Sequence, residues 1–407
     1  MTRRVAVTGM GVVTSHGIGK AVNWQKTLAG ESGIRPITLF DTAGYRTARA
    51  GQLAELPVAP WRRLRASRLD RASHLLYHAT AEALDESGVT TTEWDASRAA
   101  AALGTTLGGM GSGERYHRGY VSQGPARARP SQVVDHLAHA QPLHLMEEFS
   151  LHGVPLVFSN ACASGANAVG YGFHLVRADQ ADLALCGGYD PLCEFAFAGF
   201  HSLQALTSEL CRPFDRRRSG LAIGEGAGVL VLEAWGRAKA RGARILGEVL
   251  GYGETNDAFH MTRPDPAGTS AALAVRRALQ DAGVPPESVG YVNAHGTGTP
   301  FNDASEAASL LAALGPRARE IPVSSTKSMI GHLLGGAGAV EGILTVLALQ
   351  TGWLPPNVNY ETPDPQCDLR IVRTATRADG VRVALSNSFG FGGANAVLVF
   401  RAVGADS

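Results

Sequence analysis

Two kinds of apolar segment alternate along the whole chain, and this alternation constrains the fold most strongly. Short apolar runs such as residues 4–8 and 99–104 are followed by longer runs rich in Ala and Leu, such as residues 71–87. Such alternation is typical of layered α/β proteins, so the sequence predicts an α/β fold. The expected strands are residues 4–8, 99–104, 156–159, 183–187, 226–233, 245–252, 291–293, 322–324, 381–386 and 396–401, and the expected helices are 71–87, 165–177, 270–282, 303–314 and 337–351.

A short echo connects two distant parts of the chain. Cys-Ala-Ser-Gly-Ala-Asn-Ala-Val at 162–169 resembles Gly-Gly-Ala-Asn-Ala-Val at 392–397, and each follows an expected strand that ends in Ser-Asn. An echo this short also arises by chance in a chain rich in Gly and Ala. If it is a repeat, the chain has two related halves, 1–240 and 241–407, whose glycine-rich turns meet at one central site.

Charge and composition argue against several classes of function. The 37 basic and 36 acidic residues nearly cancel, so no global field attracts nucleic acid or an anionic membrane. The first residues lack a long apolar run, so we expect no membrane span and a cytoplasmic location. The five cysteines are expected to be reduced thiols. The Gly-Met-Gly near the start lacks the third glycine of a dinucleotide-binding motif, and no ligand spacing predicts a metal.

Cys162 lies where an apolar strand is expected to end and a helix of small residues to begin. A thiol at a helix N-terminus faces unpaired N–H groups and the positive end of the helix dipole. We therefore expect the pKa of Cys162 to lie below the free value of about 8.5. The alternative is a buried packing cysteine, but the small neighbours would pack it poorly and would instead leave room for a substrate.

Two further motifs contain histidines. His295 lies in Asn-Ala-His-Gly-Thr-Gly-Thr-Pro, where the glycines let a ligand approach the backbone, and Thr297 and Thr299 offer hydroxyl groups. Lys327 and His332 both precede a glycine-dense helix. A lone histidine is usually structural, but these surroundings favour a positioning role for His295.

The three motifs resemble those of the elongating β-ketoacyl-acyl-carrier-protein synthases, with Cys162, His295 and His332 in the order of that family's Cys-His-His set. The resemblance implies a thiolase-like fold of two similar halves in a layered α-β-α-β-α arrangement. It also implies an acyltransferase reaction, in which Cys162 takes an acyl chain and then condenses it with malonyl-carrier protein as carbon dioxide leaves. Further matching motifs lie at 212–215, 224–227, 256–261, 354–357 and 387–393.

The resemblance assigns roles to individual residues. His295 and His332 would donate N–H groups to the enolate oxygen, and Lys327 would orient the site through an ion pair with Glu306. No cofactor is implied beyond the phosphopantetheine that the carrier protein brings. The other expected groups are an oxyanion hole of the Cys162 and Phe391 N–H groups, a gate of Phe389, Gly390, Phe391 and Gly392, a pantetheine site of Thr297 and Thr299, and an acyl pocket of Phe200, Met110 and Ser112.

A basic run supplies a candidate docking surface. Arg62, Arg63, Arg65 and Arg68 lie just before an expected helix. Carrier proteins are acidic, and the resemblance places their docking in this neighbourhood, although a solvated helix face is the alternative. The expected partners are an acyl carrier protein and, in a dimer built around the nucleophile region, a second copy or a chain-length-factor homologue. Nucleic acid and membranes are not expected partners.

Related classes of enzyme fit the motifs less well. Thiolases use a second cysteine near the C-terminal glycine-rich motif, and initiating synthases have Asn in place of His332; neither pattern is present. Non-catalytic chain-length partners have lost the nucleophile, which this chain retains as Cys162.

The biosynthetic pathway stays open at this stage. Small residues at Ser112 and Gly113 and the dense aromatic residues Phe195, Phe197 and Phe200 predict a wide, aromatic-lined acyl tunnel. Such a tunnel favours a bacterial type II polyketide pathway, and a rigid, unsaturated chain such as a polyene would suit it. Housekeeping fatty-acid elongation is the alternative.

Overall fold

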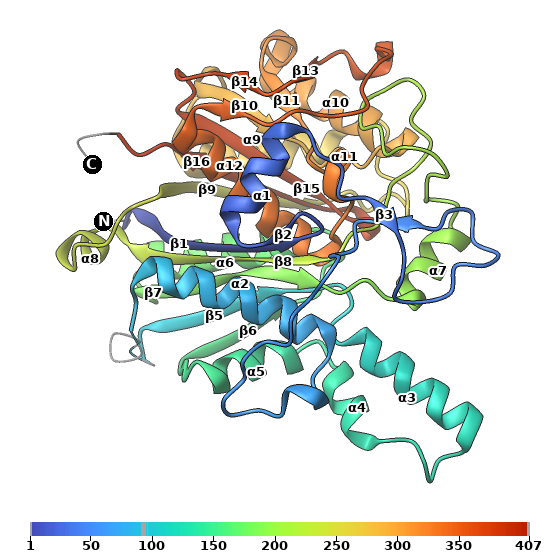
Figure 1. Cartoon of the computed structure of the whole chain (residues 1–407). Coiled ribbons are helices and arrows are strands. Elements are labelled where there is room, and N and C mark those ends of the chain that lie inside the picture. Colours follow the sequence, from blue (N-terminus) through green and yellow to red (C-terminus); the bar gives the residue numbers. More distant parts are fainter. Residues whose placement is uncertain (1, 91–94, 96, 405–407) are drawn as a thin grey trace.

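One large mixed sheet organises the molecule (Figure 1). The computed structural model describes residues 2–90, 95 and 97–404. Twelve described strands pair in the order β13-β11-β10-β15-β16-β9-β1-β8-β7-β5-β6, with β2 beside β1. They are β1 Val5–Thr14, β2 Gly17–Ile18, β5 Ala99–Gly104, β6 Val154–Phe158, β7 Leu183–Asp190, β8 Gly226–Ala234, β9 Gly247–Asn256, β10 Val289–Asn293, β11 Pro322–Ser324, β13 Arg370–Ile371, β15 Val383–Phe389 and β16 Ala394–Arg401. Smaller sheets join β3 (Arg35–Pro36) to β4 (Arg49–Ala50) and β12 (Trp353–Leu354) to β14 (Thr376–Arg377).

The helices form three layers around this sheet (Figure 1). Helix α2 packs on β1 and β8, helix α9 packs on β9 and β16, and α6 and α12 contact each other and strands of both halves. This is the predicted α-β-α-β-α order. The helices are α1 Lys20–Ala29, α2 Arg71–Ser87, α3 Met110–Gln123, α4 Pro130–His136, α5 Ala140–Glu148, α6 Ser164–Arg177, α7 Glu194–Ser202, α8 Trp235–Ala240, α9 Thr269–Ala282, α10 Pro300–Leu314, α11 Lys327–Ile330 and α12 Ala337–Thr351.

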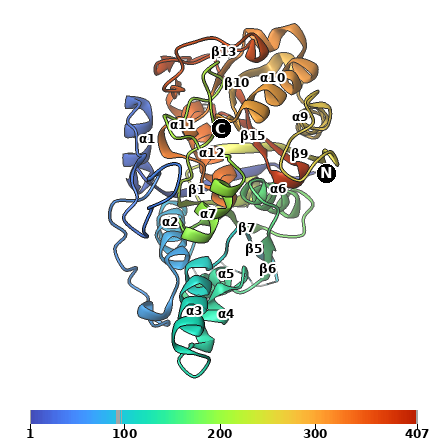
Figure 2. The ribbon, with the colours of Figure 1, turned by 90° about the vertical axis from the view of Figure 1, so that its right-hand side faces the viewer.

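The two halves of the sheet repeat one pattern of pairing. In the first half, β1 and β7 are antiparallel to β8, while β7, β5 and β6 are parallel. In the second half, β9 and β15 are antiparallel to β16, while β15, β10 and β11 are parallel. Antiparallel pairing of β1 with β9 joins the halves. Figure 2 shows helices α3 and α4 extending from the end of the first half.

Local sequence explains several element boundaries. Asp70 caps α2 by accepting a hydrogen bond of 3.0 Å from the Ala72 N–H, and Gly88 ends this helix in the left-handed conformation at φ 63°. Helix α12 is apolar on all sides apart from Glu341 and a few other polar residues, which suits its place between sheet strands of both halves. The segment Leu334–Thr351 has the length and composition of a membrane span, but 89% of it is buried inside the fold, as in a core helix.

The echo between residues 162–169 and 392–397 does not mark equivalent elements. Residues 164–169 lie in helix α6, whereas residues 394–397 lie in strand β16. Topology instead matches α6 with α12, since α6 follows β6 and α12 follows β11, the third strand of the parallel sets β7-β5-β6 and β15-β10-β11. The interpretation of the echo as a repeat was therefore wrong, although the two turns do meet, because a Cβ on Gly390 would lie 3.1 Å from the Cys162 nitrogen.

Candidate active site

Cys162 lies in a tight turn between β6 and α6. Ala161 has a φ of 45°, a left-handed conformation that few residues other than glycine adopt, and the helix begins at Ser164. The Ser164 hydroxyl accepts a hydrogen bond of 2.8 Å from the Asn160 N–H and donates one of 2.6 Å to the Ala161 carbonyl. This bonding fixes the turn, and Cys162 is left 5% exposed at one wall of a cavity.

The pKa of Cys162 differs from the sequence-based expectation. Burial raises the pKa of this thiol to about 12, while Lys327 and the backbone N–H groups of Phe391 and Cys162 lower it. The net rise corresponds to about 4 kcal/mol, whereas a helix dipole contributes about 0.3–1 kcal/mol. The prediction of a lowered pKa was wrong because it counted the helix end and not the burial.

The two histidines lie together in the lining of the same cavity. The rings of His295 and His332 are 5.2 Å apart and almost perpendicular, and Phe389 lies 5.9 Å from the His295 ring. Burial lowers the pKa of both histidines well below the usual value, and Lys327 lowers both further. Both imidazoles are therefore neutral, so each carries one N–H donor. Both His332 nitrogens and the Nδ1 of His295 are buried without a hydrogen-bond partner, so these atoms are available to a ligand.

Lys327 pairs with a different carboxylate from the one predicted. Its ammonium group forms a buried ion pair with Glu341 of α12. Glu306 instead accepts hydrogen bonds of 2.8 and 2.7 Å from the His295 and Gly296 N–H groups and one from the Asn387 side chain. The predicted Lys327–Glu306 pair was wrong. The signal that was missed is Glu341 itself, the charge within an otherwise apolar helix.

The Gly-Phe-Gly-Gly segment lies over the nucleophile and is tied to the loop after β9. Phe391 stacks on Phe200 with ring centroids 5.6 Å apart. The Gly392 N–H donates to the Met261 carbonyl at 2.8 Å, and the Asn256 side chain donates to the Gly392 carbonyl at 2.9 Å. Gly392 has a φ of 81°, which a residue with a Cβ rarely adopts.

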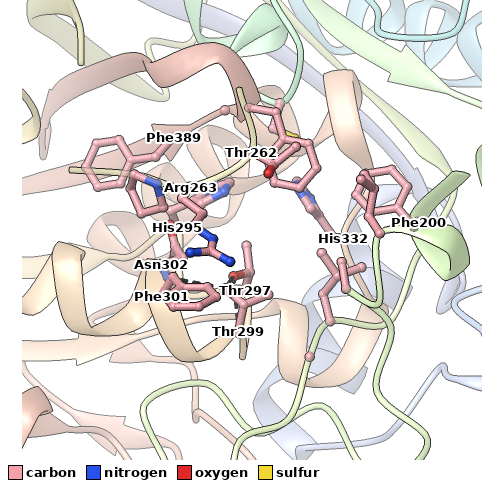
Figure 3. A pocket seen from close by; sticks show the side chains of 18 of the residues that line it. Phe200, Thr262, Arg263, His295, Thr297, Thr299, Phe301, Asn302, His332 and Phe389 are labelled. Atoms are coloured by element: carbon pink, nitrogen blue, oxygen red, sulfur yellow. Dashed lines mark hydrogen bonds between the residues drawn. The ribbon is translucent and has the colours of Figure 1, made fainter. Parts of the chain in front are cut away.

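One cavity of about 280 Å³ brings most of the predicted residues together (Figure 3). The predicted residues that line it are Cys162, Phe200, His295, Thr297, Thr299, His332, Phe389, Gly390, Phe391 and Gly392. Prediction missed other lining residues, among them Thr262, Arg263, Phe301 and Asn302. These lie in a loop and in the first turn of α10, where the sequence carries no pattern pointing to a ligand.

The predicted acyl-pocket residues divide between this cavity and its surroundings. Met110 lies outside the cavity lining but packs against the cluster that contains Cys162. Ser112 does not line the cavity, because its hydroxyl donates to Asp135 at 2.7 Å in a buried polar cluster. Phe197 is fully buried against other core residues, and Phe195 is 63% exposed. The predicted aromatic tunnel was therefore wrong for Phe195 and Phe197.

A buried carboxylate that prediction missed holds the segments around the nucleophile. Asp190, at the end of β7, accepts hydrogen bonds from the Thr106, Leu107 and Gly335 N–H groups at 2.9, 2.8 and 2.6 Å. Burial raises the pKa of Asp190 to about 6. Leu107 packs against the same apolar cluster as Cys162, so Asp190 fixes part of the surroundings of the thiol.

The four predicted docking arginines are exposed on the surface before α2. The backbone N–H groups of Arg62 and Arg63 donate to Glu148, which fixes this segment against α5. Arg68 lines a surface groove together with three arginines that prediction missed, Arg115, Arg127 and Arg129. Separately, no group of three or more metal-binding side chains lies together within the part of the chain that the structure describes.

Comparisons with known proteins agree with this geometry. Residues 2–238 match the family described as "Beta-ketoacyl synthase, N-terminal domain", and residues 246–361 match "Beta-ketoacyl synthase, C-terminal domain". The chain is 40% identical to the 3-oxoacyl-[acyl-carrier-protein] synthase 2 of Synechocystis sp., over 98% of both chains.

Solved structures extend the similarity to the whole fold. The ishigamide ketosynthase/chain length factor matches with a TM-score of 0.95 and 37% identity, over 99% of this chain and 100% of that one. A ketosynthase bound to its type II PKS acyl-carrier protein matches with a TM-score of 0.92 and 30% identity over the same shares. Together with the family matches, these similarities confirm the expected family and fold: the chain belongs to the β-ketoacyl synthase family.

Proposed function

We propose that the protein is a β-ketoacyl-acyl-carrier-protein synthase in which Cys162 is the nucleophile and His295 and His332 are the catalytic histidines. One observation carries this proposal: a buried thiol and two neutral imidazoles with unpartnered nitrogens line the same cavity. Because no described side chain uses these nitrogens, they are free to bind a substrate oxygen.

The first half of the reaction is acyl transfer to Cys162. The Cys162 sulfur attacks the carbonyl carbon of the carrier-bound thioester, and the bond from that carbon to the pantetheine sulfur breaks. The thiol proton ends on the released pantetheine thiol. Backbone N–H groups of Cys162 and Phe391 lie at hydrogen-bonding positions around the thiol and are suited to bind the oxyanion that forms beside it.

The second half is decarboxylative condensation. A malonyl thioester places its carbonyl oxygen between the two imidazole N–H groups, which stabilise the enolate formed as carbon dioxide leaves. The resulting carbanion attacks the acyl carbon on Cys162 and releases the cysteine thiolate, which takes up a proton. Lys327 and Glu306 do not line the cavity and act as positioning residues: the Lys327 charge lowers the pKa of both histidines, and Glu306 accepts a hydrogen bond from the His295 N–H.

We further propose that the chain acts in the cytoplasm as a dimer, with an acyl carrier protein as its substrate-bearing partner. Strand β6 ends the sheet immediately before Cys162, and its Val154 is 53% exposed, which supports a second subunit at this edge. The partner is either a second copy or a chain-length-factor homologue. The ishigamide structure pairs a ketosynthase with a chain length factor.

For the pathway, we propose a type II polyketide component, with fatty-acid elongation as the alternative. The similarity to a ketosynthase in complex with a type II PKS acyl-carrier protein supports the polyketide assignment. The aromatic-tunnel argument no longer supports it, since Phe195 and Phe197 do not line the cavity.

Intact mass spectrometry tests the reaction directly. Wild type and Cys162→Ala are incubated with saturated and polyunsaturated acyl-carrier proteins, and malonyl-carrier protein is added afterwards. We expect wild type alone to gain the acyl mass and then to lose it as a chain two carbons longer. A preference for polyunsaturated chains supports the polyketide assignment, and a preference for saturated chains supports fatty-acid elongation. Absence of acylation in every combination, including mixtures with a partner subunit, would contradict the proposal and leave a non-catalytic role.

Carrier docking at the arginine run has its own test. We expect Arg68→Glu to lower the rate with an acyl-carrier protein several-fold more than the rate with a small acyl-pantetheine donor, since only the carrier is acidic. Arg276→Glu, which makes the same charge reversal on the exposed face of α9, is the matched control for Arg68→Glu. Equal losses with both donors would rule out docking at Arg68.

A further inference from the structure

Two charged side chains, one positive and one negative, lie among the described residues that line the active-site cavity. Among the described residues that line the cavity, Arg263 is the single arginine or lysine. The one carboxylate that lines it belongs to Asp257, and this group already accepts hydrogen bonds from the Asn395 side chain at 2.7 Å and from the Asp265 N–H at 3.1 Å. Asp257 is thus bonded to neutral donors and, among the described residues, forms no ion pair with Arg263, so the guanidinium group stays available for a ligand.

The position of Arg263 is set by an aromatic contact. Its guanidinium carbon lies 4.8 Å from the centre of the Phe301 ring, a cation–π distance. Among the residues that the structure describes, the guanidinium has no ion pair or hydrogen bond. Figure 3 shows it reaching into the cavity above Phe301 and Thr297. A planar donor group held in this way matches the oxygen atoms of a phosphate.

The proposed function defines what enters this mouth. A phosphopantetheine arm carries its thioester at one end and its phosphate at the other, with two neutral amides between them. When the thioester reaches Cys162, the amides pass the hydroxyls of Thr297 and Thr299, which also line the cavity. The phosphate is the charged group of the arm itself, and it is the last part of the arm to enter.

We propose that Arg263 is a specificity-determining residue that binds the phosphate of the phosphopantetheine arm at the cavity mouth. This inference rests on the proposed function. The malonyl carboxylate is the other anion that a substrate brings to this cavity. Binding it to a guanidinium would stabilise the ground state before carbon dioxide leaves and so oppose the reaction. The phosphate keeps its charge throughout, so its binding carries no such penalty.

Matched donors separate these two sources of negative charge. Acyl-pantetheine and acyl-4′-phosphopantetheine differ only in the phosphate, and neither carries a malonyl group. In wild type, Arg263→Ala, Arg263→Lys and Arg276→Ala, the rate of Cys162 acylation by each donor is followed by intact mass. We expect the phosphorylated-to-unphosphorylated ratio of kcat/KM to fall about tenfold in Arg263→Ala, the size of a charge-assisted contact at an exposed site.

The other variants make the test specific. Arg263→Lys keeps the charge and should restore part of the ratio, and Arg276→Ala, which alters an exposed arginine of α9 outside the cavity, should leave it at the wild-type value. Equal losses with both donors, or an unchanged ratio in Arg263→Ala, would overturn the proposal. A loss seen with malonyl donors and absent with acyl donors would assign Arg263 to the carboxylate instead.

Calorimetric titration with 4′-phosphopantetheine and with pantetheine gives a readout that does not depend on turnover. A preference for 4′-phosphopantetheine that disappears in Arg263→Ala supports the phosphate site even if Cys162 is never acylated. If Cys162 is acylated but wild type binds 4′-phosphopantetheine and pantetheine equally, the result supports the proposed function and contradicts the phosphate site.

Discussion

The two halves of the molecule share a frame but contribute different chemistry. Cys162 lies between β6 and α6, and His332 lies between β11 and α12, which are equivalent places in the two halves. His295 follows β10, whereas the matching segment after β5 carries Leu107, which packs beside Cys162. The repeated frame therefore fixes where reactive groups can lie, and the side chains at those places decide what each half does.

The buried charges of the two halves show the same contrast. Asp190 in the first half and Glu306 in the second half each accept several backbone N–H groups next to the cavity. The second half also contains the Lys327–Glu341 pair, whose lysine lowers the pKa of both histidines and of Cys162. A charge in the second half thus lowers the pKa of the nucleophile in the first half.

The largest effect is expected from breaking the pair in the second half. Lys327→Ala leaves the Glu341 carboxylate buried without its cation, so the free energy of unfolding should fall by about 3–5 kcal/mol. Burial raises the pKa of Glu341 to about 7, against the lowering effect of Lys327. Without Lys327 the pKa of Glu341 should rise further, above 7. A folded-state pKa above the unfolded one means that stability is lost as pH rises, so the variant should regain stability as the pH falls below that higher pKa.

Urea denaturation of a double-mutant cycle checks which carboxylate is the partner. Lys327→Met with Glu341→Leu should destabilise much less than the sum of the single changes. The cycle of Lys327→Met with Glu306→Gln should be close to additive. Strong coupling in the second cycle alone would restore the ion pair predicted from sequence.

Because the nucleophile and the histidines lie in different halves, we expect histidine substitutions to slow decarboxylation without preventing acylation of Cys162. His295→Ala and His332→Ala should each slow malonyl decarboxylation by about 10²–10³, the cost of losing one donor to a developing oxyanion. An acyl group should still appear on Cys162 in both variants. Carbon dioxide release and intact mass measure the two steps separately, and a loss of acylation equal to the loss of decarboxylation would contradict this division.

Asp190 and Glu306 provide a direct comparison between the halves. Asp190→Asn and Glu306→Gln should each lower the free energy of unfolding by about 1–3 kcal/mol, because an amide nitrogen replaces one acceptor for buried N–H groups. We expect Asp190→Asn to alter the preference for acyl chain length through Leu107, and Glu306→Gln to slow decarboxylation through His295. Chain-length competition and carbon dioxide release measure the two effects, and identical changes in both assays would contradict the distinction.

The smallest expected effect concerns the pH dependence of the thiol. With its pKa raised to about 12, the thiolate fraction of Cys162 should grow about tenfold for each pH unit across the neutral range. Iodoacetamide labelling, corrected with Cys162→Ala, measures this slope. A plateau below pH 8.5 would show that the helix end outweighs burial.

The sequence predicted the parts of the site that depend on local patterns. Helix α2 and strands β5 and β11 have the predicted bounds, because their apolar periodicity and end residues are local. The cavity holds Cys162 and both histidines, which were found from motifs. The helices missing from the prediction are α1, α3, α4, α5, α7, α8 and α11.

What the sequence could not supply is set by packing between distant segments. The partner of Lys327 depends on how α11 approaches α12, which no local pattern encodes. The pKa of Cys162 depends on the central helix layer and on the turn around Phe391. Ser112 lies in a segment that was correctly placed near the nucleophile, but its hydroxyl turns to Asp135, and a direction of that kind is decided by tertiary contacts.

The layer formed by α6 and α12 also affects synthesis of the chain on a ribosome. Helix α6 emerges long before α12, and until then its apolar face has no partner from the second half. The nascent first half therefore exposes an apolar surface next to its nucleophilic cysteine. Chaperone binding to such a surface protects against aggregation. Co-expression of residues 1–240 and 241–407 as separate polypeptides would lengthen the exposure of this surface. Synthesis of both halves as one polypeptide therefore lowers the risk of aggregation.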